Sequence, residues 1–457
     1  MNVGFISLGC SKNLVDTEMM IGLFNEKGFK IVNDPKEAEI IVVNTCGFIE
    51  SAKEEAINTL LEMAEYKKGK CKYLVATGCM VERYKKELEK ELPEVDLFIK
   101  FSEYNTFWEQ IVEKGLLNPL INANEKHNKR GNLEKDYNKL DFNQRIVSTG
   151  VNYAYLRIAD GCDNFCTFCA IPYIRGRFKS RKEEDILKEA EKLVKQGYRE
   201  LIVIAQDTTK YGIDIYNKTK LAELLNKLSN IQGVEWIRFL YSYPENITDE
   251  LIETVKNNPK ICKYFDIPMQ HCSNKILKAM NRKTTKEKMM ELIKKLREQI
   301  PDVIIRSTLM VGFPGETEEE FDELYKFVQW AKFDKLGCFA YSKEEGTSAE
   351  KMPNQVHYKT KTSRYNKIMA LQQSISKSNL ARFIGKELNI LVEDAFVNDN
   401  GELYFVGRSY MDVPEIDGYI YIKGNKEIQR KIELNTFAKC KIIEVSEYDL
   451  IGEFIAE

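Results

Sequence analysis

Three apolar runs in the first hundred residues each end in a cysteine, and this pattern limits the possible fold more than any other feature of the chain. The runs are residues 3–8, 39–44 and 73–77. The cysteines that end them are Cys10, Cys46 and Cys79. A helical pattern follows each cysteine, at residues 14–27, 51–66 and 82–92. Short buried strands that alternate with helices predict an open, parallel α/β sheet.

The three cysteines are expected to converge on one site, because the carboxyl ends of parallel strands lie at one edge of a sheet. Helix N-termini at that edge also favour the thiolate form. A single cysteine at a strand end is more often a small core residue. Three in the same position of a repeated unit favour a set of metal ligands, whereas Cys71 precedes its strand and is interpreted as incidental.

A second group of three cysteines lies within eight residues, at Cys162, Cys166 and Cys169. Structural zinc sites and ordinary ferredoxin clusters use four protein ligands, and the next Cys or His is Cys262. A cluster bound here would therefore keep one iron open to a non-protein ligand. A thioredoxin-like redox pair at Cys166 and Cys169, or half of a zinc knuckle, are the simpler alternatives.

The spacing of this second group, with Phe168 before the last cysteine, resembles the signature of the radical S-adenosylmethionine superfamily. The resemblance implies a 4Fe–4S cluster whose open iron binds the amino and carboxylate groups of S-adenosylmethionine. It also implies that Cys162, Cys166 and Cys169 are the catalytic cysteines.

Strands and helices continue to alternate after residue 153. Strands are expected at residues 154–159, 201–205, 236–240, 264–267, 303–309 and 336–341. Amphipathic helices are expected at residues 183–195, 249–256, 287–299 and 318–330. The alternation predicts a parallel sheet with right-handed crossovers. About six such units correspond to the partial TIM-like (β/α)6 barrel that the superfamily resemblance implies.

Polar residues at the carboxyl ends of these strands are the candidates for the active site. They are Gln206–Asp207, Tyr241–Tyr243, Gln270–His271 and Arg306–Thr308. The segment Gly312–Glu316 resembles the family's glycine-bearing turn near the adenosine of the cofactor. The residues predicted to bind S-adenosylmethionine are Gln206, Arg306, Ser307, Gly312 and Glu316. The planar fork of Arg306 suits the methionyl carboxylate, with a structural ion pair as the alternative, and His271 is interpreted as a hydrogen-bonded structural residue.

The C-terminal part changes from α/β to β after one long helix, expected at residues 356–381. Short β runs follow at residues 388–393, 403–407, 419–422 and 438–445. They predict a small five-stranded OB-like barrel, similar to the TRAM module. The predicted domains are residues 1–125 (N-terminal), 126–150 (linker), 151–350 (radical S-adenosylmethionine core), 351–384 (connecting helix) and 385–457 (TRAM).

Several motifs together resemble the methylthiotransferases, which insert sulfur and a methyl group into an unactivated C–H bond. They are Ser7–Glu18, Asn44–Ile49 and Gly78–Cys79. Residues Lys12–Asp16 and Arg408–Gly418 resemble the RimO branch, which modifies a ribosomal protein. The tRNA-modifying MiaB branch usually has a Gln-Met-Asn run at the first of these positions.

The resemblance implies an enzyme with two 4Fe–4S clusters. The cluster at Cys162, Cys166 and Cys169 cleaves S-adenosyl-L-methionine to a 5′-deoxyadenosyl radical. The cluster at Cys10, Cys46 and Cys79 holds sulfur, from sulfide or polysulfide, on its open iron. The implied product is 3-methylthio-aspartate, formed at an aspartate β-carbon of the twelfth small-subunit ribosomal protein, with a flavodoxin or ferredoxin as electron donor.

Two other functions stay open at this point. One is the same chemistry on a tRNA adenosine, as in the MiaB branch. The other is a non-enzymatic iron–sulfur electron carrier or sensor with an RNA-binding tail. Production of 5′-deoxyadenosine after reduction would separate an enzyme from a carrier.

Composition and charge restrict the cellular location of the protein and its binding partners. The N-terminus lacks the features of a signal peptide, and no apolar run approaches the length of about 20 residues that spans a bilayer. A cytoplasmic protein with reduced cysteines is therefore expected, without a membrane partner. From residue 380 onward, nine Lys and Arg stand against fifteen Asp and Glu. An acidic tail should attract a basic ribosomal protein and repel tRNA, so reversing Asp412, Glu415 and Asp417 to Lys is expected to weaken substrate binding.

The ligand assignment predicts the results of two triple replacements. Cys162, Cys166 and Cys169 replaced by Ala should leave about four irons per chain and no cleavage of S-adenosylmethionine. Cys10, Cys46 and Cys79 replaced by Ala should leave cleavage intact and stop methylthiolation. Iron analysis and product assays measure both, and a triple variant that kept both clusters would refute the assignment. Cys71, Cys262, Cys272, Cys338 and Cys440 should be dispensable for iron.

Overall fold

The computed structural model describes residues 1–115, 144–150, 152–424 and 428–455. These residues form two compact units. Unit 1 contains Met1–Ser148, Arg157–Glu189 and Glu344–Glu350, and unit 2 contains Thr149–Leu156, Ala190–Lys343 and Lys351–Glu457. The predicted domain boundaries stay predictions, and residues 116–143, which include most of the predicted linker, lie outside the described residues. Within the described ranges, no helix has both the length and the apolar character needed to cross a membrane.

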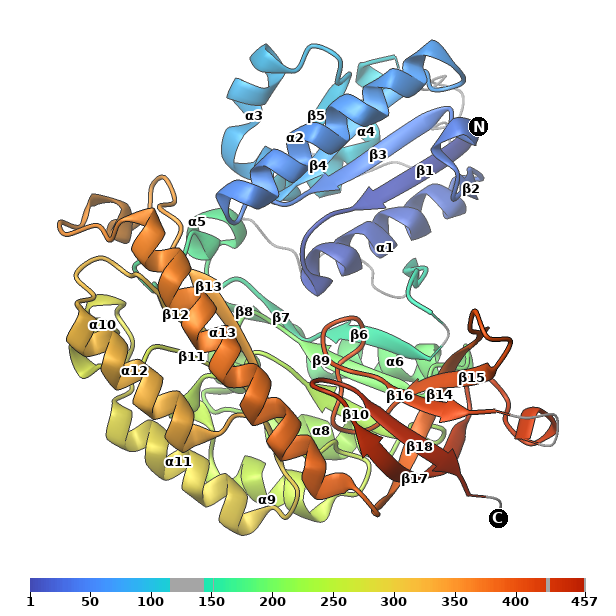
Figure 1. Cartoon of the computed structure of the whole chain (residues 1–457). Coiled ribbons are helices and arrows are strands. Elements are labelled where there is room, and N and C mark those ends of the chain that lie inside the picture. The colour runs from blue at the N-terminus through green and yellow to red at the C-terminus, as the bar shows by residue number, and fades with distance from the viewer. Residues whose placement is uncertain (116–143, 151, 425–427, 456–457) are drawn as a thin grey trace. The chain divides into compact units, whose positions relative to one another are not determined.

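Unit 1 is built around a five-stranded parallel sheet in the order β2-β1-β3-β4-β5 (Figure 1). The strands are β1 (Asn2–Ser7), β2 (Lys30–Val32), β3 (Ile40–Thr45), β4 (Tyr73–Gly78) and β5 (Leu97–Ile99). The helices are α1 (Ser11–Glu26), α2 (Glu50–Glu65), α3 (Cys79–Glu91) and α4 (Phe107–Glu113). The predicted open parallel α/β fold is confirmed, although the short edge strands β2 and β5 were not predicted.

Two separate apolar clusters cover the two faces of this sheet. One takes Met20 and Phe24 from α1 together with Phe107 and Ile111 from α4. The other takes its side chains from α2 and α3, among them Leu60 and Leu88. The order of the strands reverses between β1 and β3, and ligands of doubly wound sheets bind beyond the strand ends at such a point. The first two cysteines, Cys10 and Cys46, follow these two strands.

The second cysteine loop also belongs to unit 1. It runs from β7 (Ala159–Asp160) to α5 (Ile171–Arg175), after which the chain returns as β8 (Lys179–Ser180). Ala170 and Ile174 are part of the same apolar cluster as α1 and α4. Burial of these side chains therefore fixes the loop of Cys162, Cys166 and Cys169 to the N-terminal sheet.

Unit 2 contains the six core strands that the alternation predicted. They are β6 (Tyr153–Arg157), β9 (Glu200–Ile204), β10 (Trp236–Phe239), β11 (Tyr264–Gln270), β12 (Ile304–Val311) and β13 (Lys335–Ala340). They form two three-stranded sheets, β10-β9-β6 and β11-β12-β13, joined by one bridge between Ile237 and Ile261. We call this arrangement the half-barrel.

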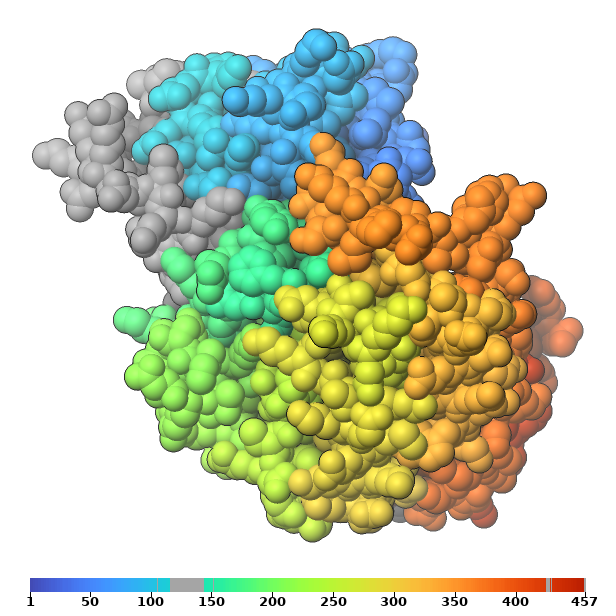
Figure 2. All heavy atoms as spheres, turned by 90° about the vertical axis from the view of Figure 1, so that its left-hand side faces the viewer, coloured from blue at the N-terminus to red at the C-terminus, as the bar shows by residue number. Residues whose placement is uncertain are grey.

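Helices lie between the strands of the half-barrel along the chain, and their residues are among those coloured from green to orange in Figure 2. The main ones are α6 (Glu183–Lys195), α8 (Leu221–Ser229), α9 (Asp249–Asn257), α11 (Lys286–Gln299) and α12 (Glu318–Ala331). The long helix α13 (Tyr358–Leu380) lies against β13 and α12. Its Gln372 donates to the carbonyl oxygen of Phe333, a bond of 2.8 Å.

The tail of unit 2 is a closed five-stranded barrel in the order β14-β15-β16-β18-β17. Its strands are β14 (Glu387–Val397), β15 (Leu403–Arg408), β16 (Ile420–Lys423), β17 (Phe437–Val445) and β18 (Leu450–Phe454). The predicted small barrel is confirmed, and β18 is the strand for which no residues were predicted. We call these five strands the tail barrel.

Buried charges join the tail barrel to the half-barrel. Arg408 is fully buried and its Nη2 pairs with Glu200 at 2.8 Å, and Arg238 pairs with the same carboxylate at 2.8 Å. Buried charges must be paired, because an unpaired charge in the protein interior loses its hydration and costs several kcal/mol of folding free energy. The segment that resembles the RimO branch therefore begins with a residue that joins the two barrels.

Two of the three acidic residues expected to form a docking surface, Asp412 and Asp417, are buried or partly buried in the same seam, and this corrects the expectation for them, whereas Glu415 is exposed. Asp412 pairs with Lys335 at 2.7 Å, and Asp417 accepts from the hydroxyl of Tyr264 at 2.7 Å. Glu415 accepts from the hydroxyl of Tyr153 at 3.2 Å. Reversing these three charges would disrupt the seam, so loss of substrate binding in that variant would say nothing about a docking surface.

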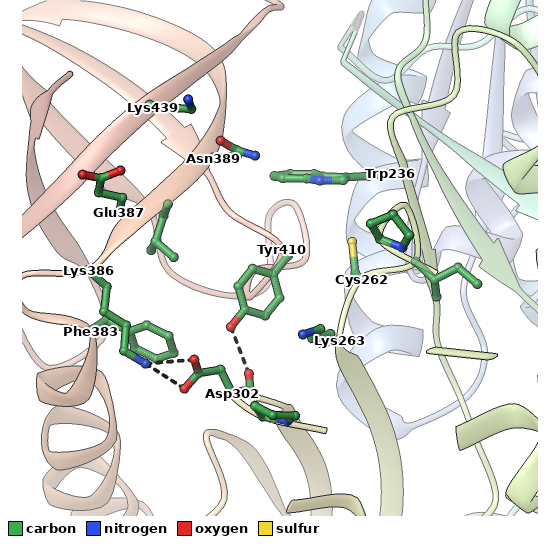
Figure 3. Close-up of a pocket in the computed structure, with 14 residues that line it drawn as sticks. Trp236, Cys262, Lys263, Asp302, Phe383, Lys386, Glu387, Asn389, Tyr410 and Lys439 are labelled. Atoms are coloured by element: carbon green, nitrogen blue, oxygen red, sulfur yellow. Dashed lines mark hydrogen bonds and ion pairs between the residues drawn. The ribbon is translucent and has the colours of Figure 1, made fainter. Parts of the chain in front are cut away.

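A cavity of about 460 Å³ lies at this seam (Figure 3). Its wall includes Trp236, the first residue of β10, and Lys263, which directly precedes β11. Within it, Tyr410 donates to the carbonyl oxygen of Asp302, whose carboxylate binds Lys386. The cavity therefore lies at the amino ends of the strands, opposite the ends where barrel enzymes place their active sites.

Candidate iron–sulfur sites

Glycines bring the three strand-end cysteines of unit 1 close together. A Cβ on Gly9 would lie 2.9 Å from the Sγ of Cys46, and a Cβ on Gly47 would lie 3.1 Å from the carbonyl carbon of Cys79. Gly78 has a φ of +102°, and a Cβ there would lie 2.3 Å from the carbonyl oxygen of Thr45. The turns after β1, β3 and β4 therefore pack closely only because these positions lack side chains.

Asparagine and threonine side chains fix the same turns by hydrogen bonds. The amide of Asn13 donates to the carbonyl oxygen of Leu8 at 2.7 Å, and Asn44 donates to the carbonyl oxygen of Asn13 at 2.8 Å. Thr45 donates to the carbonyl oxygen of Thr77 at 2.5 Å. The motifs that resembled the methylthiotransferases thus hold residues whose role in unit 1 is to position the cysteines.

The three thiols differ in exposure and influence one another. Cys10 is exposed, Cys46 is partly buried and Cys79 is buried. Burial raises the pKa of Cys46, and Cys10 raises it further, whereas the guanidinium of Arg175 lowers it. Burial raises the pKa of Cys79 to about 12, again against the effect of Arg175. Metal binding replaces the thiol proton, so a fixed positive charge beside these sulfurs favours the ligand form.

The loop of the second cysteine group is held by its own backbone and by Asp163. Cys162 N donates to the carbonyl oxygen of Gly176 at 3.1 Å, and Cys169 N to that of Cys166 at 3.0 Å. A Cβ on Gly161 would lie 2.1 Å from the carbonyl oxygen of Arg177. The Asp163 carboxylate accepts from Arg177 Nε at 2.6 Å. These contacts fix the conformation of the loop.

A segment far along the chain completes this site. Ala349 N donates to the carbonyl oxygen of Thr167 in the cysteine loop at 2.8 Å. In the same segment, Glu344 accepts from Glu50 N at the start of α2, and Arg83 donates to the carbonyl oxygen of Glu345. The segment Glu344–Glu350 thus contacts the surroundings of both cysteine groups, and nothing in the sequence indicated it.

Four buried charges connect the two groups, and sequence reasoning missed them as well. Asp16 of α1 pairs with Arg157 at 2.5 Å and with Arg175 at 2.7 Å. Asp160, two residues before Cys162, pairs with Arg175 at 3.1 Å and with Arg157 at 3.4 Å. We call these residues the arginine–aspartate cluster. The only signal in the sequence was the presence of charged residues directly before and after the second cysteine group.

The donor sets fit iron–sulfur clusters better than single ions. Among the described residues, no three His, Cys, Asp or Glu residues are close enough to hold one metal ion. A cluster binds each thiolate to a different iron, so its ligands stand farther apart than those of one ion. Three thiols without a fourth ligand suit a cluster with an open iron, whereas structural zinc sites use four.

The other five cysteines are all buried. Burial raises the pKa of Cys71 and Cys272, and it raises the pKa of Cys262, Cys338 and Cys440 to about 12. Thiols of this kind stay protonated at neutral pH. Their predicted dispensability for iron stays a prediction.

The residues predicted to bind S-adenosylmethionine lie in unit 2, where most have polar partners. Ser307 donates to the carbonyl oxygen of Ile267 at 2.8 Å. Glu316 accepts from Gly312 N at 2.8 Å and from Arg364 at 2.7 Å. Gln206 lies two residues after the end of β9 and is partly buried. Their contacts with the cofactor stay predictions.

Arg306 does not lie at the carboxyl end of its strand, because β12 continues to Val311. It pairs with Asp266 at 3.0 Å and lies 3.8 Å from Asp417 of the tail. These contacts favour the structural ion pair. His271 is also tied into the structure, since its Nδ1 accepts from Ser273 N at 3.0 Å.

Strained backbone marks two of the predicted strand ends. Tyr241 has a φ of 64° and Gln270 a φ of 69°, values that non-glycine residues rarely adopt. Such strain is concentrated at functional sites. Tyr241 lies two residues after β10 and Gln270 ends β11, and the location of the active site at these strand ends stays a prediction.

Comparisons with known proteins agree with this architecture. Residues 2–100 match the Uncharacterized protein family UPF0004, residues 156–328 the Radical SAM superfamily and residues 384–455 the TRAM domain. A solved radical S-adenosylmethionine methyltransferase, TsrM from Kitasatospora setae, is similar with a TM-score of 0.53 and 12% identity, over 74% of this chain and 72% of that one. At this identity, the similarity shows the fold alone.

Curated relatives are similar over the whole chain. The chain is 56% identical over 457 residues, 100% of both proteins, to the ribosomal protein uS12 methylthiotransferase RimO of Alkaliphilus oremlandii. It is 49% identical over 455 residues, 99% of this chain and 100% of the relative, to the protein of the same name from Thermoanaerobacter sp. (strain X514).

The packing of the strand-end turns predicts the effect of one methyl group. Gly78→Ala should displace the turn before Cys79 and cause loss of iron from the N-terminal site, because its Cβ would overlap Thr45. Gly28→Ala is the matched control, since Gly28 also has a positive φ, of +80°, but no atom within 4 Å of its added Cβ. Iron per chain and thermal unfolding are the measurements. Equal iron content in both variants would contradict the prediction.

Proposed function

This chain belongs to the family of ribosomal protein uS12 methylthiotransferases RimO, and we propose that it transfers a methylthio group to the β-carbon of an aspartate in that ribosomal protein. The observation that carries the proposal is identity of 56% along the whole chain, tail included, to a relative with this name. The enzyme is thus a transferase of a sulfur-containing group that uses radical S-adenosylmethionine chemistry. A ribosomal protein substrate also favours the cytoplasm as its location.

The Radical SAM superfamily match supports one 4Fe–4S cluster and S-adenosylmethionine. We assign that cluster to Cys162, Cys166 and Cys169, and a second cluster to Cys10, Cys46 and Cys79. When bound, these groups supply the electron that cleaves S-adenosylmethionine and the sulfur that is transferred. The chain itself holds the six thiols in folded turns, through its glycines in both groups and the buried guanidinium of Arg175 beside Cys79.

Exposure of the thiols indicates how a sulfur source reaches the N-terminal site. Cys79 is buried, whereas Cys10 is exposed, so a small sulfur species approaches from the side of Cys10. We propose sulfide or polysulfide as this co-substrate and a flavodoxin or ferredoxin as the electron donor.

Mass spectrometry of ribosomal protein and tRNA, from cells with and without the gene, tests the substrate. We expect uS12 to lose its methylthio-aspartate in the deletion strain and to regain it when the gene is restored. The tRNA adenosines should be unchanged, because the alternative is the tRNA branch of the same chemistry. Loss of methylthio groups from tRNA alone would refute the proposal.

Docking of the substrate on the tail barrel is tested best with acidic residues outside the seam. Asp394 and Asp399 are exposed, and the ring of Phe396 between them is 42% exposed and stacks on Tyr404. Cationic side chains bind to carboxylates and aromatic faces of this kind. We propose that this hairpin contacts the basic ribosomal protein.

Asp394→Lys with Asp399→Lys should weaken binding of uS12 at least tenfold at low salt, and less at high salt, because exposed charges are screened. The control is Glu291→Lys with Glu298→Lys, the same change of charge on exposed positions of α11. Binding is measured by titration of the full-length enzyme with uS12 and with tRNA. Equal loss in both variants, or tight binding of tRNA, would contradict docking on the tail barrel.

A further inference from the structure

Arg175, a member of the arginine–aspartate cluster, also contacts a candidate iron ligand. Its guanidinium binds Asp16 at 2.7 Å and Asp160 at 3.1 Å, and its Nη2 lies 3.9 Å from the Sγ of Cys79. It also lies over the ring of Phe101, 4.1 Å from the centroid. The residue is 2% exposed, so water does not screen these contacts. Arg175 therefore touches parts of both cysteine groups.

The charges of the arginine–aspartate cluster sum to zero when the cysteine thiols are left out of the count. Arg157 and Arg175 carry two positive charges, and Asp16 and Asp160 carry two negative ones. Ionisation of Cys10, Cys46 and Cys79, and any electron added there, brings excess negative charge to a site with a buried thiol. Arg175 donates a hydrogen bond to one of these sulfurs, that of Cys79.

Hydrogen bonds to the sulfurs, net charge and solvent exposure set the reduction potential of an iron–sulfur cluster. Arg175 contributes the first two, because it donates to the Cys79 sulfur and carries a fixed charge. A positive charge beside the sulfur stabilises the reduced form more than the oxidised form. Asp160 and Asp16 oppose this effect, since they neutralise part of the guanidinium charge.

We propose that Arg175 is a positioning residue that raises the electron affinity of the cluster held by Cys10, Cys46 and Cys79. The inference rests on the two-cluster assignment in the proposed function. Arg175 is the last residue of α5, which begins two residues after Cys169. The position of its guanidinium, and with it the electron affinity of the N-terminal cluster, therefore depends on the fold of the second cysteine loop.

The test uses the full-length chain with Cys162, Cys166 and Cys169 replaced by Ala, so that only the N-terminal cluster is present. A redox titration followed by electron paramagnetic resonance gives its midpoint potential. Arg175→Met should lower the electron affinity about tenfold, which is a shift of about 59 mV to more negative values for one electron. Asp160→Asn should shift the potential the opposite way, because it leaves the charge of Arg175 less compensated.

The control is Arg177→Met, which removes the same charge two residues away. The side chain of Arg177 is 72% exposed and pairs with Asp163 rather than with a cysteine, so its loss should leave the potential unchanged. Arg175→Lys keeps the charge without the planar fork and should give a potential between those of Met and Arg. A merely structural role of Arg175 would not produce shifts of opposite sign in Arg175→Met and Asp160→Asn.

The outcomes separate this inference from the proposed function. If the chain with three Ala replacements holds no iron, the assignment of the second cluster fails, and the inference fails with it. If the cluster is present and Arg175→Met has the same potential as Arg177→Met, only the inference is overturned. If Arg175→Met does not fold, an unchanged potential in Asp160→Asn overturns the inference by itself.

Discussion

Pairing of buried charges is the constraint on which unit 1 depends. Asp16 and Arg157 lie 141 residues apart in sequence, and both are buried. Removing one partner of such a pair costs about 3–5 kcal/mol, because the other charge is left without water. A second buried set, Glu18 with Arg145 and Arg181 with Glu189, extends the same contact. The N-terminal sheet and the second cysteine loop are therefore stable only when folded together.

The same kind of contact connects the surroundings of the two cysteine groups. Each group is held by its own turns, and the arginine–aspartate cluster connects them within unit 1. The strand ends of the half-barrel, which carry the strained residues Tyr241 and Gln270, belong to unit 2. The tail barrel is joined to the half-barrel by the same physical device, a buried arginine between carboxylates. The RimO-like segments of the sequence contribute residues to both of these charged contacts.

Periodicity was sufficient to predict most of the helices and strands, whereas the assignment of the six cysteines as cluster ligands stays a prediction. The helix at residues 183–195 was predicted with the bounds of α6, and all six half-barrel strands were located to within about three residues. Strands with little local signal, such as β2, β5 and β18, were missed, since they are short or stabilised by their neighbours. Helix α1 shows most clearly what the sequence pattern could not predict. Its buried side includes Asn13, Asp16 and Glu18, which in a sequence alone indicate a solvated face.

The sequence by itself determined the parallel α/β sheets, the tail barrel, the two groups of three cysteines and the family. These follow from local patterns, in which the residue type and its spacing carry the information. Only the tertiary structure decided which charges are paired. Asp16 was interpreted as part of a branch motif, and in the structure it is a buried partner of Arg157. Asp412 was interpreted as a docking residue, and it is a buried partner of Lys335. The reason is physical: a charge is a solvated surface group or a buried structural one according to what packs against it, and those partners lie far away in the sequence.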